Sequence, residues 1–211
     1  MFNKDFYEKY ALASMKFFYG KDLKNFVHSE CPDLQNEKNS IGVEVTRGIS
    51  EYEGKFSRLA IECMEKNLPL EERFSKANRM FRDNFLGVIH ENNAFVIADP
   101  ENGDNSYELH IRQIVDKIKI KVDKLEKLYK KFQTNNLYVF SEFPLKSKHI
   151  WILADLLNAE NLVQYDLYFI NALDRIYVNN TKDNFSFKKY KYTAAELCKF
   201  TKIASKNIKI H

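Results

Sequence analysis

Glycine and proline, the residues that most often interrupt regular structure, are scarce in this chain of 211 residues, with six glycines and four prolines. Their scarcity excludes a loop-built or disordered protein and favours long helices and strands joined by short connections. Hydrophobic residues make up 45% of the chain and aromatic residues 14%, so material for a core is ample. We therefore expect an ordinary globular fold.

Cysteine is also scarce, and the three cysteines (Cys31, Cys63 and Cys198) lie far apart without CxxC or Cys/His spacing. This pattern argues against a disulfide framework and against a zinc site, so we expect reduced, buried thiols. The histidines at positions 28, 90, 110 and 149 show no HxxxH or other ligand spacing, and we assign no catalytic role to them.

Long apolar runs and phosphate-binding glycine loops are missing as well. The amino terminus, with Asp5 and Glu8 between its aromatic residues, lacks the pattern of a signal peptide, so we expect a cytoplasmic protein. Without a P-loop, a dinucleotide motif or GxSxG, the sequence argues against an NTPase, a dehydrogenase or an acyl hydrolase of those kinds. The formal charge of +4 is compatible with a polyanionic partner but does not establish one.

Helical and strand patterns alternate along the chain. Phe6, Tyr10 and Ala13 recur at helical spacing, and the run 41–46 reads as a buried strand. Short apolar runs near residues 94–98, 137–140, 166–170 and 175–178 predict further strands, the first of them a core strand, with helices around 151–157 and 193–204. The alternation predicts an α/β fold with a mixed central sheet flanked by helices on both faces.

The longest predicted helix runs from Asn105 to Phe132. Its apolar positions follow the helical period, and we expect Ile111, Ile118, Val122 and Leu125 to be buried. Its lysines, at 117, 119, 121, 124, 127, 130 and 131, could follow a nucleic-acid backbone, but acidic residues interrupt them and a solvated surface is the favoured interpretation. Trp151, in a later helix, is interpreted as a core residue.

Two carboxylates stand out in the first quarter of the sequence. Asp33 follows Pro32 in a polar loop, and Glu44 lies inside the apolar run Ile41-Gly42-Val43-Glu44-Val45-Thr46. An unpaired acid in a buried strand is costly, so Glu44 needs a partner or a function. Two carboxylates brought together across a hairpin would form an oxygen-rich site suited to Mg²⁺, which completes its shell with water and substrate phosphate.

Pro32-Asp33, a variable loop and then Glu44-Val45-Thr46 on a strand resemble the motif of the PD-(D/E)XK nuclease superfamily. The predicted order is also similar, because members of that superfamily have a helix before a strand hairpin that carries the motif, then a helix and further strands. The resemblance implies a restriction-endonuclease-like core over about residues 1–143. Residues 144–211 would be a C-terminal extension of helices and strands within a single α/β domain, residues 1–211.

By this resemblance Asp33 and Glu44 are metal ligands, and the backbone carbonyl of Val45 is a possible third. Thr46 occupies the place of the motif's lysine, which in the family orients or activates the attacking water, so another cation must replace it or activity is impaired. Lys55, on a predicted helical face shared with Arg58, is the preferred replacement. Arg47 is a second candidate, and Arg47 and Arg58 are possible phosphate-binding residues.

An additional acid beside the metal could come from Glu8 or Glu30, with a slight preference for Glu8. Each assignment also has a structural alternative, because Asp33 can be a turn residue and Glu44 can pair with Arg47 or Lys55. The expected function is a Mg²⁺- or Mn²⁺-dependent nuclease acting on DNA. The alternative is a catalytically inactive protein of the same fold that binds nucleic acid or protein.

Overall fold

The computed structural model describes residues 4–49, 107–141, 144–182 and 186–206, together with residue 69, residues 71–72 and 75–76, and the strands at 86–89 and 95–98. The chain divides into two compact units, one formed by residues 2–48 and 110–210 and the other mainly by residues 49–109. Within the described residues, no helix has the length and apolar character needed to cross a membrane.

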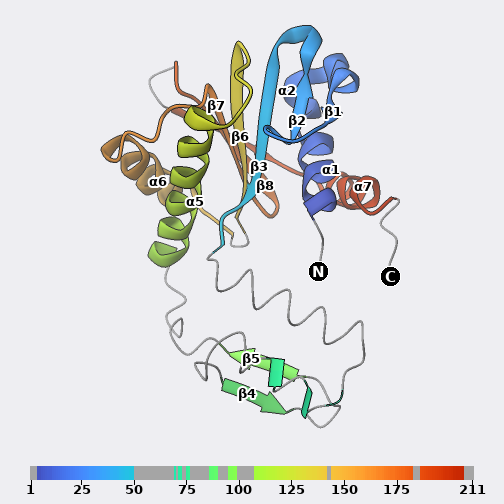
Figure 1. Ribbon diagram of the computed structural model, residues 1–211, viewed down its shortest axis with the longest axis vertical. Helices are drawn as coiled ribbons and strands as arrows, with labels where there is room; N and C mark the ends of the chain where they lie inside the picture. Colours follow the sequence, from blue (N-terminus) through green and yellow to red (C-terminus); the bar gives the residue numbers. More distant parts are fainter. Residues whose placement is uncertain are drawn as a thin grey trace. The chain divides into compact units, whose positions relative to one another are not determined.

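The larger unit is built on a seven-stranded sheet (Figure 1). In spatial order its strands are β1 (Val27–His28), β2 (Leu34–Asn36), β3 (Ile41–Arg47), β6 (Thr134–Ser141), β7 (Leu167–Ala172), β8 (Arg175–Asn180) and β9 (Ser186–Lys191). The first three pair antiparallel, β3, β6 and β7 run parallel, and β7, β8 and β9 pair antiparallel again. The predicted mixed sheet is therefore confirmed.

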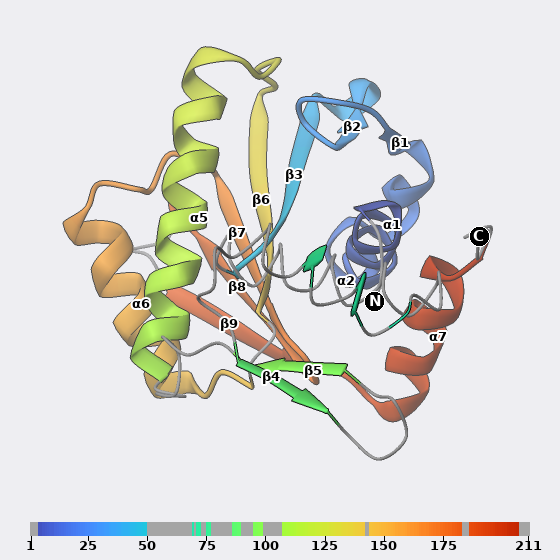
Figure 2. The ribbon, with the colours of Figure 1, turned by 60° about the horizontal axis from the view of Figure 1, so that its bottom comes forward.

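Helices cover both faces of this sheet (Figure 2). On one face lie α1 (Lys4–Ser14), α2 (Lys16–Tyr19) and α7 (Ala194–Ala204), and on the other lie α5 (Tyr107–Lys127) and α6 (Ser147–Ala159). Two short 3₁₀ helices, η1 (Gly20–Asn25) and η2 (Glu37–Asn39), flank the strands β1 and β2. The predicted α/β architecture with helices on both faces is confirmed.

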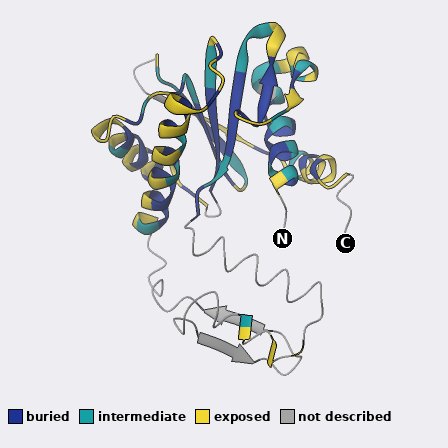
Figure 3. Ribbon diagram, viewed as in Figure 1, coloured by how far each residue is buried: buried dark blue, intermediate teal, exposed yellow. Residues whose placement is uncertain are grey.

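Each face of the sheet has its own hydrophobic core, and Figure 3 shows the buried residues concentrated on the strands and on the inward sides of the helices. Val43 and Val45 of β3 belong to the core under α1 and α7. Because side chains alternate along a strand, Glu44 between them faces α5 instead. The strand pattern thus points one acid into the interface between the sheet and α5.

The helix α5 buries the predicted apolar residues Ile111, Ile118, Val122 and Leu125, which confirms the helical period. The helix ends at Lys127 rather than at residue 132. The interpretation of Trp151 as core is wrong, since this side chain on α6 is 56% exposed. It lies between inward-facing Ile150 and Leu153 on the helix and so points outward.

Two further expectations need correction. The strand predicted near residues 94–98 forms as β5 (Phe95–Ala98), but it pairs with β4 (Leu86–Ile89) in a separate two-stranded sheet instead of joining the central one. The thiols of Cys31 and Cys198 are free, as expected, but exposed rather than buried. Cys198 lies on the outward face of α7, whose buried residues are Phe200 and Ala204, and Cys63 lies outside the described residues.

A candidate carboxylate site

Glu44 on β3 is 3% exposed and faces α5. Its Oε1 atom accepts a hydrogen bond from the Tyr129 hydroxyl at 2.7 Å and is also bound by the ammonium group of Lys121. Lys121 lies on α5, which covers this face, and Tyr129 lies two residues after the end of α5. The partners compensate part of the cost of burying the carboxylate.

The other oxygen of the same carboxylate, Oε2, is buried and has no hydrogen-bond partner among the described residues. Burial raises the pKa of Glu44 above its ordinary value, the positive charge of Lys121 opposes this, and the negative charge of Asp33 adds to the increase. An unpartnered buried carboxylate oxygen is rare because it is costly, and a bound cation is one way of satisfying it.

Asp33 stands immediately before β2 and is 3% exposed. Its Oδ2 accepts a hydrogen bond from the backbone N–H of Val45 at 2.8 Å, and its Oδ1 lies 2.8 Å from the ammonium nitrogen of Lys4. The loop that carries Asp33 packs closely on the sheet, because a Cβ atom on Gly42 would lie 2.8 Å from Cγ of Pro32. The absence of a side chain at Gly42 lets Pro32 and Asp33 approach β3.

The helix α1 adds a third acid, Glu8, which is 7% exposed. Its Oε1 lies 3.3 Å from the Lys4 ammonium nitrogen, and its Oε2 lies 3.1 Å from Nδ1 of His28 on β1. Lys4 therefore bridges Glu8 and Asp33. Of the two acids predicted as additional ligands, Glu8 is the one in this network, whereas Glu30 is exposed.

The remaining predicted site residues are Val45, Thr46, Arg47, Lys55 and Arg58, and the structure describes the first three. Val45 is buried, with its N–H donated to Asp33. Arg47, at the end of β3, places its guanidinium carbon 4.9 Å from the centre of the Tyr7 ring, and Thr46 alternates onto the same face as Glu44. Lys55 and Arg58, predicted as replacement cation and phosphate-binding residue, lie outside the described residues.

Sequence reasoning missed the residues that pair with these acids. Lys121 was expected in solvent, but its side chain is only 17% exposed and binds Glu44, so that expectation is wrong for this lysine. A signal was present, because Lys121 follows the buried Ile118 by three residues and precedes Leu125 by four, which places it beside the buried stripe of the helix. Lys4 carried no comparable signal.

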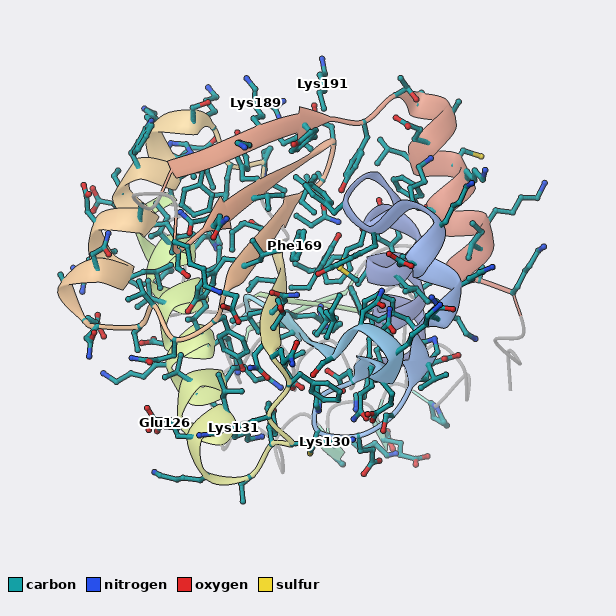
Figure 4. All side chains as sticks on the ribbon, turned by 90° about the horizontal axis from the view of Figure 1, so that it is seen from above. Glu126, Lys130, Lys131, Phe169, Lys189 and Lys191 are labelled. Carbon is teal, nitrogen blue, oxygen red and sulfur yellow. The ribbon has the colours of Figure 1, made fainter. Side chains whose placement is uncertain are left out.

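A basic rim lies beside the Asp33 loop. The backbone N–H of Lys130 donates to the carbonyl of Cys31 at 3.2 Å, and the Lys130 ammonium pairs with Glu37 at 2.5 Å. In Figure 4, Lys130 and Lys131 lie together near Glu126, while Lys189 and Lys191 on β9 lie on the opposite side of the view. Lys130 therefore lies beside the loop that carries Asp33, with its ammonium group paired to Glu37.

The chemistry of these residues fits a hard divalent cation. No group of three or more His, Cys, Asp or Glu side chains in the described part of the chain is arranged to hold a metal. Mg²⁺, however, is usually bound through one or two carboxylates and keeps several waters. Asp33 and Glu44, with the unpartnered Oε2 of Glu44, are the candidates for such a smaller donor set.

Comparison with protein-family models, with curated proteins and with solved structures found no match for this chain.

Proposed function

We propose that the chain is a Mg²⁺-dependent nuclease that hydrolyses DNA phosphodiesters at a degenerate PD-(D/E)XK site. The observation that carries this proposal is the carboxylate of Glu44, buried on a central strand with Oε1 held by Lys121 and Tyr129 and Oε2 without a partner among the described residues. Asn179 also buries side-chain atoms without partners among the described residues, but Glu44 is a carboxylate, and burying a charged group that is only partly paired is costlier than burying a neutral amide.

The order of the elements supports a restriction-endonuclease-like core. α1 precedes three antiparallel strands, with Asp33 before β2 and Glu44 on β3, and α5 then leads into β6, parallel to β3. This order agrees with a helix, a strand hairpin that carries the motif, a helix and further strands. The core would then occupy the β1 to β6 part of the sheet, and β7 to β9 would extend it.

In the proposed mechanism Asp33 and Glu44 would hold the ion, and Val45 fixes Asp33 through its backbone N–H. The bound ion would polarise the scissile phosphate and lower the pKa of a bound water. Lys121 takes the role of the missing lysine, because Thr46 carries no charge and the Lys121 ammonium already contacts Glu44. Tyr129 orients the Glu44 carboxylate by donating its hydroxyl hydrogen.

DNA is the proposed substrate because Lys130 of this basic rim borders the Asp33 loop and Lys131 lies beside Lys130. Lysines neutralise backbone phosphates without reading sequence. Such contacts would hold a duplex near the acids.

A second function is an inactive protein of the same fold that binds nucleic acid or protein. Two observations favour it: Thr46 stands at the lysine position, and Asp33 and Glu44 each already pair with a lysine. Under this alternative Lys4 and Lys121 neutralise the acids permanently.

A plasmid-nicking assay with purified protein distinguishes the two functions. The wild type should cleave DNA only with Mg²⁺ or Mn²⁺, and Glu44→Ala should lower the rate by about 100-fold or more because it removes a metal ligand. Asn179→Ala is the matched control, since Asn179 also has buried side-chain atoms without partners among the described residues but lies on β8. This control should cleave at the wild-type rate.

Circular dichroism of both variants checks that each remains folded. Cleavage that survives Glu44→Ala would remove the proposed site. A folded wild type that binds the metal but is inactive on DNA and RNA would favour the inactive binding protein.

A further inference from the structure

Lys4 occupies an unusual position among the lysines of the site. Its ammonium nitrogen lies 2.8 Å from Oδ1 of Asp33 and 3.3 Å from Oε1 of Glu8, while its own side chain is 67% exposed. The two carboxylates are 4% and 9% exposed. One positive charge from the solvent side therefore bridges two buried acids.

Lys121 offers the useful contrast. Its side chain is 17% exposed and extends from α5 to the sheet, where Lys121 and Tyr129 both contact Oε1 of Glu44. Releasing Lys121 would require part of the interface between α5 and the sheet to open. Lys4 has no such restraint on its stem, so its ammonium group can leave the carboxylates by rotation of an exposed side chain.

The location of Lys4 on its helix makes that release easier. It is the first residue of α1, where the helix dipole disfavours positive charge. Its pair with Glu8 also has lysine on the amino-terminal side, the weaker order for residues four apart. Local helix energetics do not hold Lys4 in place, and its contact with Asp33 does.

The Lys4 group remains a cation throughout the physiological range. A lysine amine is protonated at neutral pH, and here it lies within ion-pair distance of two carboxylates. The bridge is thus a charge interaction, and a competing cation can take the place of the Lys4 ammonium group. While Lys4 contacts an Asp33 oxygen, that oxygen is a poorer ligand for a metal.

We propose that Lys4 is a built-in competitor of the divalent cation, which blocks Oδ1 of Asp33 until metal binding displaces its ammonium group. This inference rests on the proposed metal site, and it makes occupancy of that site conditional on an exposed, modifiable amine. Neutralising Lys4 should increase metal affinity, whereas neutralising another lysine of the same helix should not.

Calorimetric titration with Mn²⁺ provides the first test. Lys4→Met should tighten Mn²⁺ binding by about tenfold. The ion would then no longer have to break the charged hydrogen bond between Lys4 and Asp33, and the free energy of one such bond corresponds to about that change in affinity. Lys9→Met is the matched control, because Lys9 lies on the same helix and pairs with Asp5 at 2.5 Å, away from the site. It should change the affinity by less than about twofold, the effect expected of a screened charge at a distance.

Acetylation of the wild type, followed by mass spectrometry, supplies a second readout whose main comparison, with and without Mn²⁺, needs no variant. Saturating Mn²⁺ should make the Lys4 amine several-fold more reactive, because displacement frees it, and should leave Lys9 unchanged. The Glu44→Ala variant, with its metal site removed, should show no response of Lys4.

The outcomes separate this inference from the proposed function. Mn²⁺ binding that depends on Glu44 would support the metal site. If, in addition, Lys4→Met leaves the Mn²⁺ affinity unchanged and Mn²⁺ leaves the reactivity of Lys4 in the wild type unchanged, the role of Lys4 as a competitor is refuted and the metal site stands. If neither wild type nor Lys4→Met binds Mn²⁺, both fail. Binding by Lys4→Met that is undetectable in the wild type would be the strongest support for competition.

Discussion

The central sheet has two sides along its strand order, β1 to β3 and β6 to β9, and they differ in the polar groups that they bury. Among the described residues, the buried acids are Glu8, Asp33 and Glu44, which lie on α1, before β2 and on β3. The buried polar side chains of β6, β7 and β8 are neutral, namely Asn136, Ser141, Asn171 and Asn179. Both sides contain polar groups, but buried negative charge is confined to the side of the sheet that precedes β6.

This difference indicates where the fold gives up stability. A neutral buried group such as Asn171 needs only a hydrogen bond, which its amide nitrogen makes to the Tyr138 hydroxyl at 2.7 Å. A buried carboxylate must also recover its lost hydration, and a lysine partner recovers it only in part. Three buried carboxylates are costly, and this cost is the physical basis of the function proposed above.

The largest stability effect is expected from Lys121→Met. This change leaves the charge of Glu44 buried with Tyr129 as its remaining partner, so the free energy of unfolding should fall by about 3 kcal/mol. Chemical denaturation measures the loss. The double variant Lys121→Met/Glu44→Gln should recover most of it, because the buried charge is then absent.

Lys119→Met is the control for that experiment, since Lys119 lies on the same helix but pairs with Glu160 on the surface at 3.3 Å. An exposed pair of this kind should change stability by about 0.5 kcal/mol or less. Equal effects of Lys119→Met and Lys121→Met would mean that the two lysines do not differ in kind, and the contrast between buried and surface charge would fail.

A smaller effect, with a defined pH dependence, is expected from Glu44→Gln. Burial raises the pKa of Glu44 in the folded state, so the Glu44 carboxylate of the wild type binds a proton more tightly when the protein is folded than when it is unfolded. The resulting stabilisation is complete below the unfolded pKa and is lost as the pH rises through the folded pKa. The glutamine of Glu44→Gln does not ionise, so this variant does not lose stability in this way. Its free energy of unfolding relative to the wild type should therefore increase as the pH rises above about 4.5.

Thermal melts from pH 5 to pH 8 would follow this change, which we expect to reach about 2 °C in Tm for a chain of this size. Asn179→Ala, from the neutral side of the sheet, should differ from wild type by the same amount at every pH. A constant offset for Glu44→Gln as well would show that Glu44 does not change its proton affinity on folding.

The sequence was sufficient for much of the architecture, because periodicity is a local property. The buried stripe of α5, the strand β3 around Glu44 and the helix α7 all follow from spacing within a few residues. The exposure of Trp151 was missed because hydrophobic residue type outweighed helical phase in its interpretation. Its neighbours Ile150 and Leu153 already occupy the inward face.

The burial of Glu44 was expected from the apolar strand around it, but its partners are Lys121 and Tyr129 rather than Arg47 or Lys55. Lys121 lies 77 residues from Glu44 in the chain, and the contact depends on how α5 packs against β3. The bridge from Lys4 to Asp33 depends equally on the placement of α1. Local patterns can locate a buried charge, whereas the group that neutralises it is set by tertiary structure.

The most direct test of the central claim is a crystal structure of the protein soaked with Mn²⁺. The account predicts one anomalous peak bound by an oxygen of Asp33 and an oxygen of Glu44, each about 2.2 Å from the ion. A well-ordered site without such a peak, or a peak that involves neither carboxylate, would contradict the claim that these buried acids form a metal site.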